Sequence, residues 1–146
     1  MANTFYNEIL TEHNANPIHK HKIDGANFVL EGINPSCGDD ITLSLKVEDG
    51  VITDGAYVGD GCAISQASAD MMLDLVIGRK KEEALRLADI FLRMIKDKIT
   101  DEEKDELEEA GILQDVSHMP ARVKCAVLGW HTMEEMLNEG KGAVEQ

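Results

Sequence analysis

Alternating apolar and polar residues mark three strands in the first half of the chain. The clearest is the stretch "ITLSLKV" at 41–47, whose two-residue period is typical of a half-buried strand. Its inward face carries Ile41, Leu43, Leu45 and Val47. The stretches "NFVLEGIN" (27–34) and "VITDGAYVG" (51–59) flank it, and Asp49-Gly50 predicts a tight hairpin turn before the third strand. We therefore expect a three-stranded antiparallel sheet.

A helical period replaces this alternation on either side of the predicted sheet. A first amphipathic helix places Phe5, Ile9 and Leu10 on one face. It is expected to end before Pro17, because the residue that precedes a proline avoids the helical backbone conformation. After the third strand, the stretch 62–78 has helical spacing and ends at a glycine, the residue that most often closes a helix.

Three more helices are expected in the second half. The stretch 80–99 has an apolar stripe that includes Leu85. A capping box that begins at Thr100 opens a short acidic helix through about Ala110, and a last helix follows Pro120. The predicted elements give an α+β fold, in which a three-stranded antiparallel sheet packs against several helices.

Composition narrows the classes of partner. The chain has 146 residues, enough for one domain with its own core, and its net charge is −14. Such an acidic surface repels phosphates, which argues against nucleic acid and anionic membranes as partners. No apolar run approaches the roughly 20 residues that span a bilayer. The first residues have no secretory pattern, so we expect a cytoplasmic protein.

The three cysteines lie at predicted structural corners. Cys37 is in the turn between the first two strands, Cys62 follows the third strand, and Cys125 is early in the last helix. The turn before the second strand and the end of its hairpin partner meet at one end of a sheet. We therefore expect Cys37, Asp39 and Cys62 to lie close together, with the last helix carrying Cys125 over them.

Three thiolates and one carboxylate form a tetrahedral donor set that suits zinc. The residues alone leave two interpretations, a shared metal site or three small buried side chains, because no Cys-x-x-Cys pair is present. Asp40 could replace Asp39 as the oxygen donor, although its position is more typical of a solvated carboxylate. His118 could also reach a metal, but its place at a helix start favours a cap region.

Three motifs resemble the U-type (NifU N-terminal-like) proteins of iron–sulfur cluster assembly: "NPSCGDD", "GDGCAISQASADMM" and "RVKCAVLGWH". The resemblance runs from the first helix to about Met136 and implies a single U-type domain over 1–146. Carried over residue by residue, Cys37, Asp39, Cys62 and Cys125 match the zinc ligands of the family. Cys37 matches the thiol that receives sulfur.

Departures from the scaffold branch of that family refine the interpretation. Lys124 stands where that branch has a histidine, the Leu-Pro-Pro-Val-Lys motif is reduced to "HMPAR" (118–122), and an extra acidic segment covers 98–115. These features resemble the SufU branch. They imply a sulfur acceptor that works with a PLP-dependent SufS-type cysteine desulfurase and feeds downstream iron–sulfur assembly proteins.

Two other functions remain open from the sequence. The same ligands suit a [2Fe–2S] cluster, so the chain could be a scaffold that assembles a cluster and passes it on. A purely structural zinc would make the protein an interaction module.

Arg122 is a candidate for contacting the partner or stabilising a thiolate. The histidines at 13, 19 and 21 have no expected partner, and the acidic run 101–109 is expected to be a solvated helix face.

Overall fold

The computed structural model describes residues 2–96 and 98–144, with side chains from Glu8 onward, so the expected burial of Phe5 lies outside the described part. It confirms the α+β fold and the three-stranded antiparallel sheet. The elements are α1 (Ala2–Ala15), β1 (Phe28–Asn34), β2 (Asp39–Glu48), β3 (Val51–Asp60), α2 (Ala63–Val76), α3 (Lys81–Ile95), α4 (Asp101–Glu106), the 3₁₀ segment η1 (Glu108–His118) and α5 (Pro120–Glu139). No helix in these ranges is long and apolar enough to cross a membrane.

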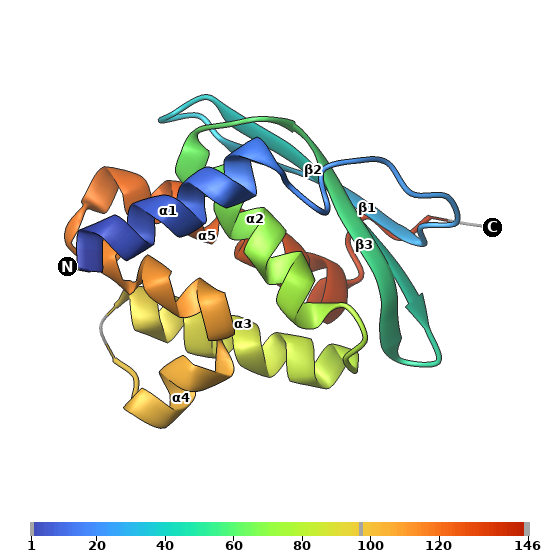
Figure 1. Ribbon diagram of the computed structural model, residues 1–146. Coiled ribbons are helices and arrows are strands. Elements are labelled where there is room, and N and C mark those ends of the chain that lie inside the picture. Colours follow the sequence, from blue (N-terminus) through green and yellow to red (C-terminus); the bar gives the residue numbers. More distant parts are fainter. Residues whose placement is uncertain (1, 97, 145–146) are drawn as a thin grey trace.

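The sheet has the order β1-β2-β3, and the helices cover one of its faces (Figure 1). Its second hairpin turns at Asp49 and Gly50, which have φ angles of 52° and 78°, as a two-residue turn with both central residues left-handed requires. β2 begins at Asp39, two residues earlier than the apolar alternation indicates, because Asn34 pairs with Asp39 across the first hairpin. That pairing brings the predicted metal ligands to one end of the sheet.

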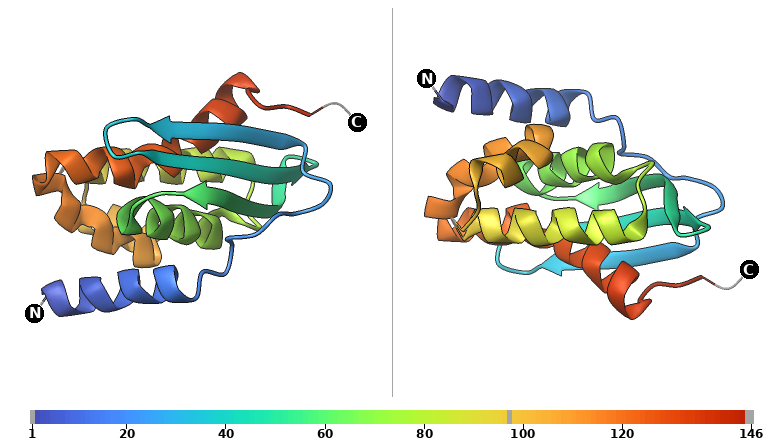
Figure 2. Two further views of the ribbon diagram at one scale, coloured as in Figure 1. Left: turned by 90° about the horizontal axis from the view of Figure 1, so that it is seen from above. Right: turned by 90° about the horizontal axis from the view of Figure 1, so that it is seen from below.

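α5 crosses the sheet beside α2 and is held there by close packing (Figure 2). A side-chain carbon added at Gly129 would lie 3.4 Å from Ala69, so the two helices approach each other closely at this point. One residue further along α5, the indole N–H of Trp130 donates to Ser68 Oγ over 3.0 Å, and the Trp130 ring stacks on Phe91 of α3 at a centroid distance of 4.2 Å. These contacts fix where the first turns of α5 lie.

The acidic segment differs from its prediction in two ways. The capping box at Thr100 is confirmed, but α4 ends at Glu106, because the chain turns at Glu108 with a left-handed φ of 50°. The segment is also only partly solvated. Its carboxylates face arginines spaced seven residues apart along α3 and the turn before it, in the pairs Arg79–Glu108, Arg86–Glu106 and Arg93–Glu103.

The arginine pairs hold the segment against α3 rather than leaving it free. Arg93 donates through two nitrogens to Glu103, and this contact lowers the pKa of Glu103 to about 2. Solvent screens exposed pairs of this kind, so the apolar side chains beneath carry most of the attachment. Those side chains are Leu107, Ala110, Leu113 and Val116.

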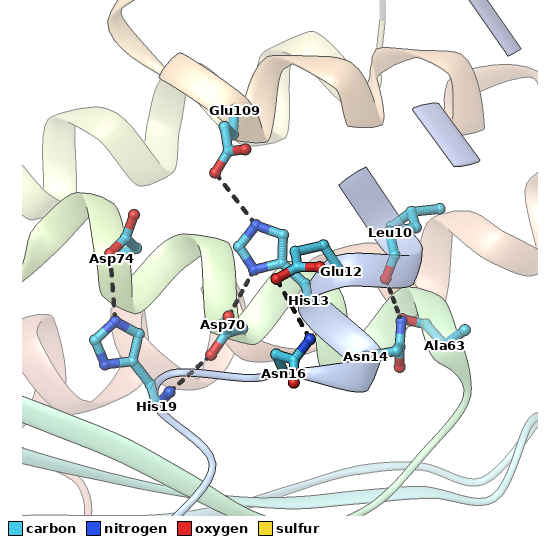
Figure 3. A network of polar contacts seen from close by, with 10 residues as sticks. All are labelled: Leu10, Glu12, His13, Asn14, Asn16, His19, Ala63, Asp70, Asp74 and Glu109. Atoms are coloured by element: carbon cyan, nitrogen blue, oxygen red, sulfur yellow. Dashed lines mark hydrogen bonds and ion pairs between the residues drawn. The ribbon is translucent and has the colours of Figure 1, made fainter. Parts of the chain in front are cut away.

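His13 joins α1 to the rest of the molecule, which corrects the expectation that it has no partner. Its ring is buried, Nδ1 lies 2.6 Å from Asp70 Oδ2, and Nε2 lies 3.2 Å from Glu109 Oε1 (Figure 3). The backbone N–H of His19 donates to the other oxygen of Asp70 over 2.9 Å. Since both ring nitrogens face carboxylates, only the imidazolium can donate to both.

The pH dependence of this contact has a definite sign. Burial alone would lower the pKa of His13, but the hydrogen bonds to Asp70 and Glu109 outweigh it and raise the pKa above 6.5. The contacts of protonated His13 therefore contribute their full stabilisation below pH 6.5. This stabilisation is lost as the pH rises through the pKa of His13 in the folded state. After deprotonation, a ring lone pair faces one of the two carboxylates.

We therefore expect His13→Gln to lower the free energy of unfolding by about 1–3 kcal/mol at pH 6 and by clearly less at pH 9. Urea denaturation of both proteins at the two pH values measures this. His21→Gln is the matched control, because His21 is exposed and its ring contacts the carbonyl of the neighbouring Lys22 rather than a carboxylate. An equal loss at both pH values would contradict an imidazolium at position 13.

Candidate metal centre

The predicted ligands meet where β1, β2, α2 and α5 converge. Cys37 lies in the turn between β1 and β2, Asp39 is the first residue of β2, and Cys125 lies in the second turn of α5. One donor atom from each of these three lies within 4.8 Å of the other two. The structure thus brings Cys125 to Cys37 and Asp39, which lie far from it in the chain.

Cys62 borders this group without belonging to it. It is the N-cap residue of α2, and its Sγ accepts a hydrogen bond from the backbone N–H of Ser65 over 3.4 Å. Its own backbone N–H donates to Asp39 Oδ1 over 2.8 Å. The Cys62 sulfur therefore stands at the positive end of the α2 dipole, beside the free N–H groups of the first turn.

Asp39 is a fully buried carboxylate with a complete set of donors. Burial alone would raise its pKa, but four surrounding groups outweigh this and lower the pKa below the ordinary value. They are the backbone N–H of Cys62, the thiol of Cys125, the amide of Asn34 and the hydroxyl of Ser65. The carboxylate is therefore anionic at neutral pH and already oriented.

Cys125 has the opposite electrostatic situation. Burial raises the pKa of its thiol, and contacts with the Cys37 and Cys62 thiols and with Asp39 raise it further. A thiol that lies beside other sulfur atoms and a carboxylate stays protonated as long as no positive charge lies among them. A bound divalent cation supplies that charge and stabilises the thiolates, so this donor set is suited to a metal.

Cys37 is the exposed member of the group. Its Sγ lies 4.0 Å from the Ala121 carbonyl at the start of α5, and its backbone N–H donates to the Asn34 carbonyl over 3.3 Å. Gly38 follows it with a left-handed φ of 73° and open space around its Cα. Cys37 therefore combines contact with the other donors and access from solvent.

The donor separations fit a small cation. Bonds of about 2.3 Å to sulfur and 2.0–2.2 Å to oxygen place tetrahedral ligands about 3.3–3.8 Å apart. The donors of Cys37, Asp39 and Cys125 lie within 4.8 Å of one another, so a small inward movement brings them to those distances. Cys62 is the adjacent fourth donor. Zinc and the iron of a thiolate-held cluster both suit these ligand types.

The other residues considered in the sequence lie away from the group. Asp40 points to the opposite, exposed face of the sheet, where its contact with Glu31 raises the pKa of that residue. His118 is exposed at the end of η1, and Arg122 is exposed and forms no ion pair with any described side chain. The N-cap residue of α5 is Met119, and Pro120 holds the first helical position.

Sequence reasoning missed Asn34 and Ser65, the two side chains that support Asp39. The Asn34 amide donates to Asp39 Oδ2 over 3.2 Å, and the Ser65 hydroxyl donates to Oδ1 over 3.2 Å. Asn34 could have been found by pairing the ends of β1 and β2, because the register places it opposite Asp39. Ser65 occupies the position of α2 that follows an N-cap by three residues, where contacts back to the cap are common.

Known proteins are similar to this chain in sequence and in architecture. Residues 5–142 match the family of NifU-like N-terminal domains. The chain is 41% identical to the iron-sulfur cluster assembly scaffold protein IscU of Streptococcus pyogenes, over 97% of this chain and 87% of that protein. It is 37% identical to the zinc-dependent sulfurtransferase SufU of Bacillus subtilis, over 95% and 93% of the two chains.

A solved structure is similar as well. It is that of a protein from Fervidobacterium islandicum described as an iron-sulfur cluster assembly scaffold protein for the SUF system. The TM-score is 0.85 at 36% identity, and the match covers 92% of this chain and 97% of the other.

If Asp39 is the oxygen donor, Asp39→Ala should bind zinc at least tenfold more weakly, while Asp40→Ala should bind it as the wild type does. Competition with a chromophoric chelator measures both affinities. The pair is well matched, since the two changes are identical and the residues adjacent. Equal affinities for the two variants would remove Asp39 from the centre.

Proposed function

The chain belongs to the family of NifU-like N-terminal domains, and from that membership we propose that it is a zinc-dependent sulfur acceptor in iron–sulfur cluster assembly. The observation that carries the proposal is the graded exposure of its cysteines. Cys37 is exposed, Cys62 is intermediate and Cys125 is buried, although Cys37 and Cys125 form one cluster with Asp39 and Cys62 borders it. One thiol can meet a partner while the other two stay inside the protein.

Four residues, Cys37, Asp39, Cys62 and Cys125, would hold the zinc in this proposal. When bound, zinc keeps its thiolate ligands deprotonated at neutral pH and so holds a nucleophile ready. Cys125 and Asp39 are buried and Cys62 is fixed as a helix cap, so these three stay in place. Cys37 lies on an exposed turn next to Gly38, and it is the ligand that can move.

The chemical step is thiol exchange with a partner's persulfide. The Cys37 thiolate attacks the terminal sulfur of a cysteine persulfide on a PLP-dependent SufS-type desulfurase. A new S–S bond forms on Cys37, the S–S bond on the desulfurase breaks, and the desulfurase cysteine leaves as a thiolate. No oxidant or reductant is needed, because the sulfur is transferred at its existing oxidation level. Downstream iron–sulfur assembly proteins would then receive it.

The name and similarity of the Bacillus subtilis relative support this function, and so does Lys124, which stands where the scaffold branch has a histidine. Lys124 is exposed beside the centre, and an ammonium group is a poor metal ligand. The free thiols suit a reducing compartment, so we propose that the protein acts in the cytoplasm.

A second function is favoured by another relative. The Streptococcus pyogenes protein is named a scaffold and is at least as similar to this chain as the sulfurtransferase is. The same thiolates and carboxylate would then hold a [2Fe–2S] cluster for transfer to acceptor proteins, with the cluster as cargo.

The metal content of the purified protein separates the two functions. We expect about one zinc per chain and no visible colour in protein purified without oxygen. Elemental analysis and the absorption spectrum give both quantities from one sample. Two irons per chain, two acid-labile sulfides and a brown colour would favour the scaffold.

Cys37 should be the first cysteine to carry sulfur. After incubation with a SufS-type desulfurase and free cysteine, mass spectrometry should find the persulfide on Cys37, and zinc-loaded protein should increase the desulfurase turnover. Cys37→Ala should abolish the increase even if part of the zinc remains. Ser36→Ala, one residue before it, is the control and should keep it. Persulfide found first on Cys62 or Cys125 would contradict the mechanism.

A further inference from the structure

Asn34 touches more of the candidate centre than any other residue outside the ligand set, among those the structure describes. It is the last residue of β1 and is buried, with 6% of its surface exposed. Its amide nitrogen lies 3.2 Å from Asp39 Oδ2 and 3.7 Å from Cys125 Sγ. Its backbone carbonyl accepts the N–H of Cys37 over 3.3 Å. One residue thus contacts three of the four candidate ligands.

The chemistry of these neighbours fixes the orientation of the amide. Asp39 is an anionic carboxylate that only accepts hydrogen bonds, and a Cys125 thiolate is likewise an acceptor. The amide nitrogen, which carries two hydrogens, must therefore face them, and the amide oxygen must face away. An oxygen placed there would repel both groups.

From this geometry we propose that Asn34 is a positioning residue of the metal centre. Its amide holds Asp39 and Cys125 as a preassembled pair, which forms the half of the centre that stays on the metal when Cys37 moves. The inference rests on the zinc site of the proposed function, and it adds a residue that orients the ligands without binding the metal. Residues with this role typically change metal affinity 10- to 100-fold when removed.

The distribution of donors supports the division into a fixed half and a mobile half. The Cys125 sulfur accepts from the Asn34 amide, and the Cys62 sulfur accepts from the Ser65 backbone N–H. No N–H group of a described residue donates to the Cys37 sulfur, which faces the Ala121 carbonyl. N–H donors spread the negative charge of a thiolate and make it less nucleophilic, so the sulfur without one is the most reactive.

The test begins with Asn34→Ala in the purified full chain. We expect its zinc affinity to fall about tenfold or more, measured by chelator competition. Cobalt(II), loaded in place of zinc, reports the geometry through its thiolate charge-transfer and d–d absorption bands. These bands should shift or weaken in the variant. Neither readout depends on a desulfurase.

Asn27→Ala is the matched control. Asn27 adjoins the other end of β1, and its side chain bonds the backbone of Val47 over 2.7 Å and 2.8 Å, away from the centre. Asn27→Ala removes the same kind of side chain next to the same strand. It should therefore lower thermal stability without changing zinc affinity or the cobalt spectrum. Asn34→Ser, which keeps a hydrogen-bond donor, serves as a second variant if the alanine variant is poorly folded, and its zinc affinity should lie between wild type and alanine.

Double-mutant cycles show through which ligand Asn34 affects the zinc affinity. In an Asp39→Ala background, Asn34→Ala should cost much less affinity than in the wild type, because its main partner has gone. In a Cys62→Ser background the two losses should add, because Asn34 does not touch Cys62. If wild-type protein binds zinc but Asn34→Ala matches Asn27→Ala in affinity and spectrum, the positioning role is refuted. If wild-type protein binds no zinc, the proposed function fails first.

Discussion

The buried carboxylate of Asp39 is the constraint around which one end of this molecule is organised. An anion removed from water costs several kcal/mol unless donors replace the lost solvent. Here the donors come from three elements: Asn34 from β1, Cys62 and Ser65 from the start of α2, and Cys125 from α5. Each element must reach its place for the charge to be satisfied. The carboxylate therefore ties the sheet to both helices that cover it.

Local sequence patterns predicted most of the fold, because the elements concerned are set by interactions between residues close together in the chain. The apolar alternation of β2, the Asp49-Gly50 turn and the capping box at Thr100 each depend on residues within a few positions of one another. The end of α4 was missed, because a left-handed φ at Glu108 has no clear mark in the sequence. One position of the α3 stripe was also misjudged, since Leu87 is buried and Leu85 is only half-buried.

The composition of the candidate site was partly predictable for a different reason. Hairpin geometry places Cys37, Asp39 and Cys62 at one end of the sheet, whereas no local pattern fixes how the last helix brings Cys125 over them. The contact of Asn34 with Cys125 was missed because the two residues lie 91 positions apart, and those of His13 because its carboxylates lie 57 and 96 residues away. Contacts at such separations follow from the packing of α1, α5 and η1, and the spacing of apolar residues along the chain does not predict that packing.

The same separations decide when the centre can form during folding. Closing a loop of 91 residues between Asn34 and Cys125 carries an entropy cost, which the stacking of Trp130 on Phe91 and the packing of Gly129 against Ala69 must offset. Short zinc modules fold around their ion, because their ligands are neighbours in the chain. In this protein the candidate ligands come from elements that are far apart in the chain, so they meet only when the sheet and α5 have packed. We therefore expect the topology to form before any metal is bound.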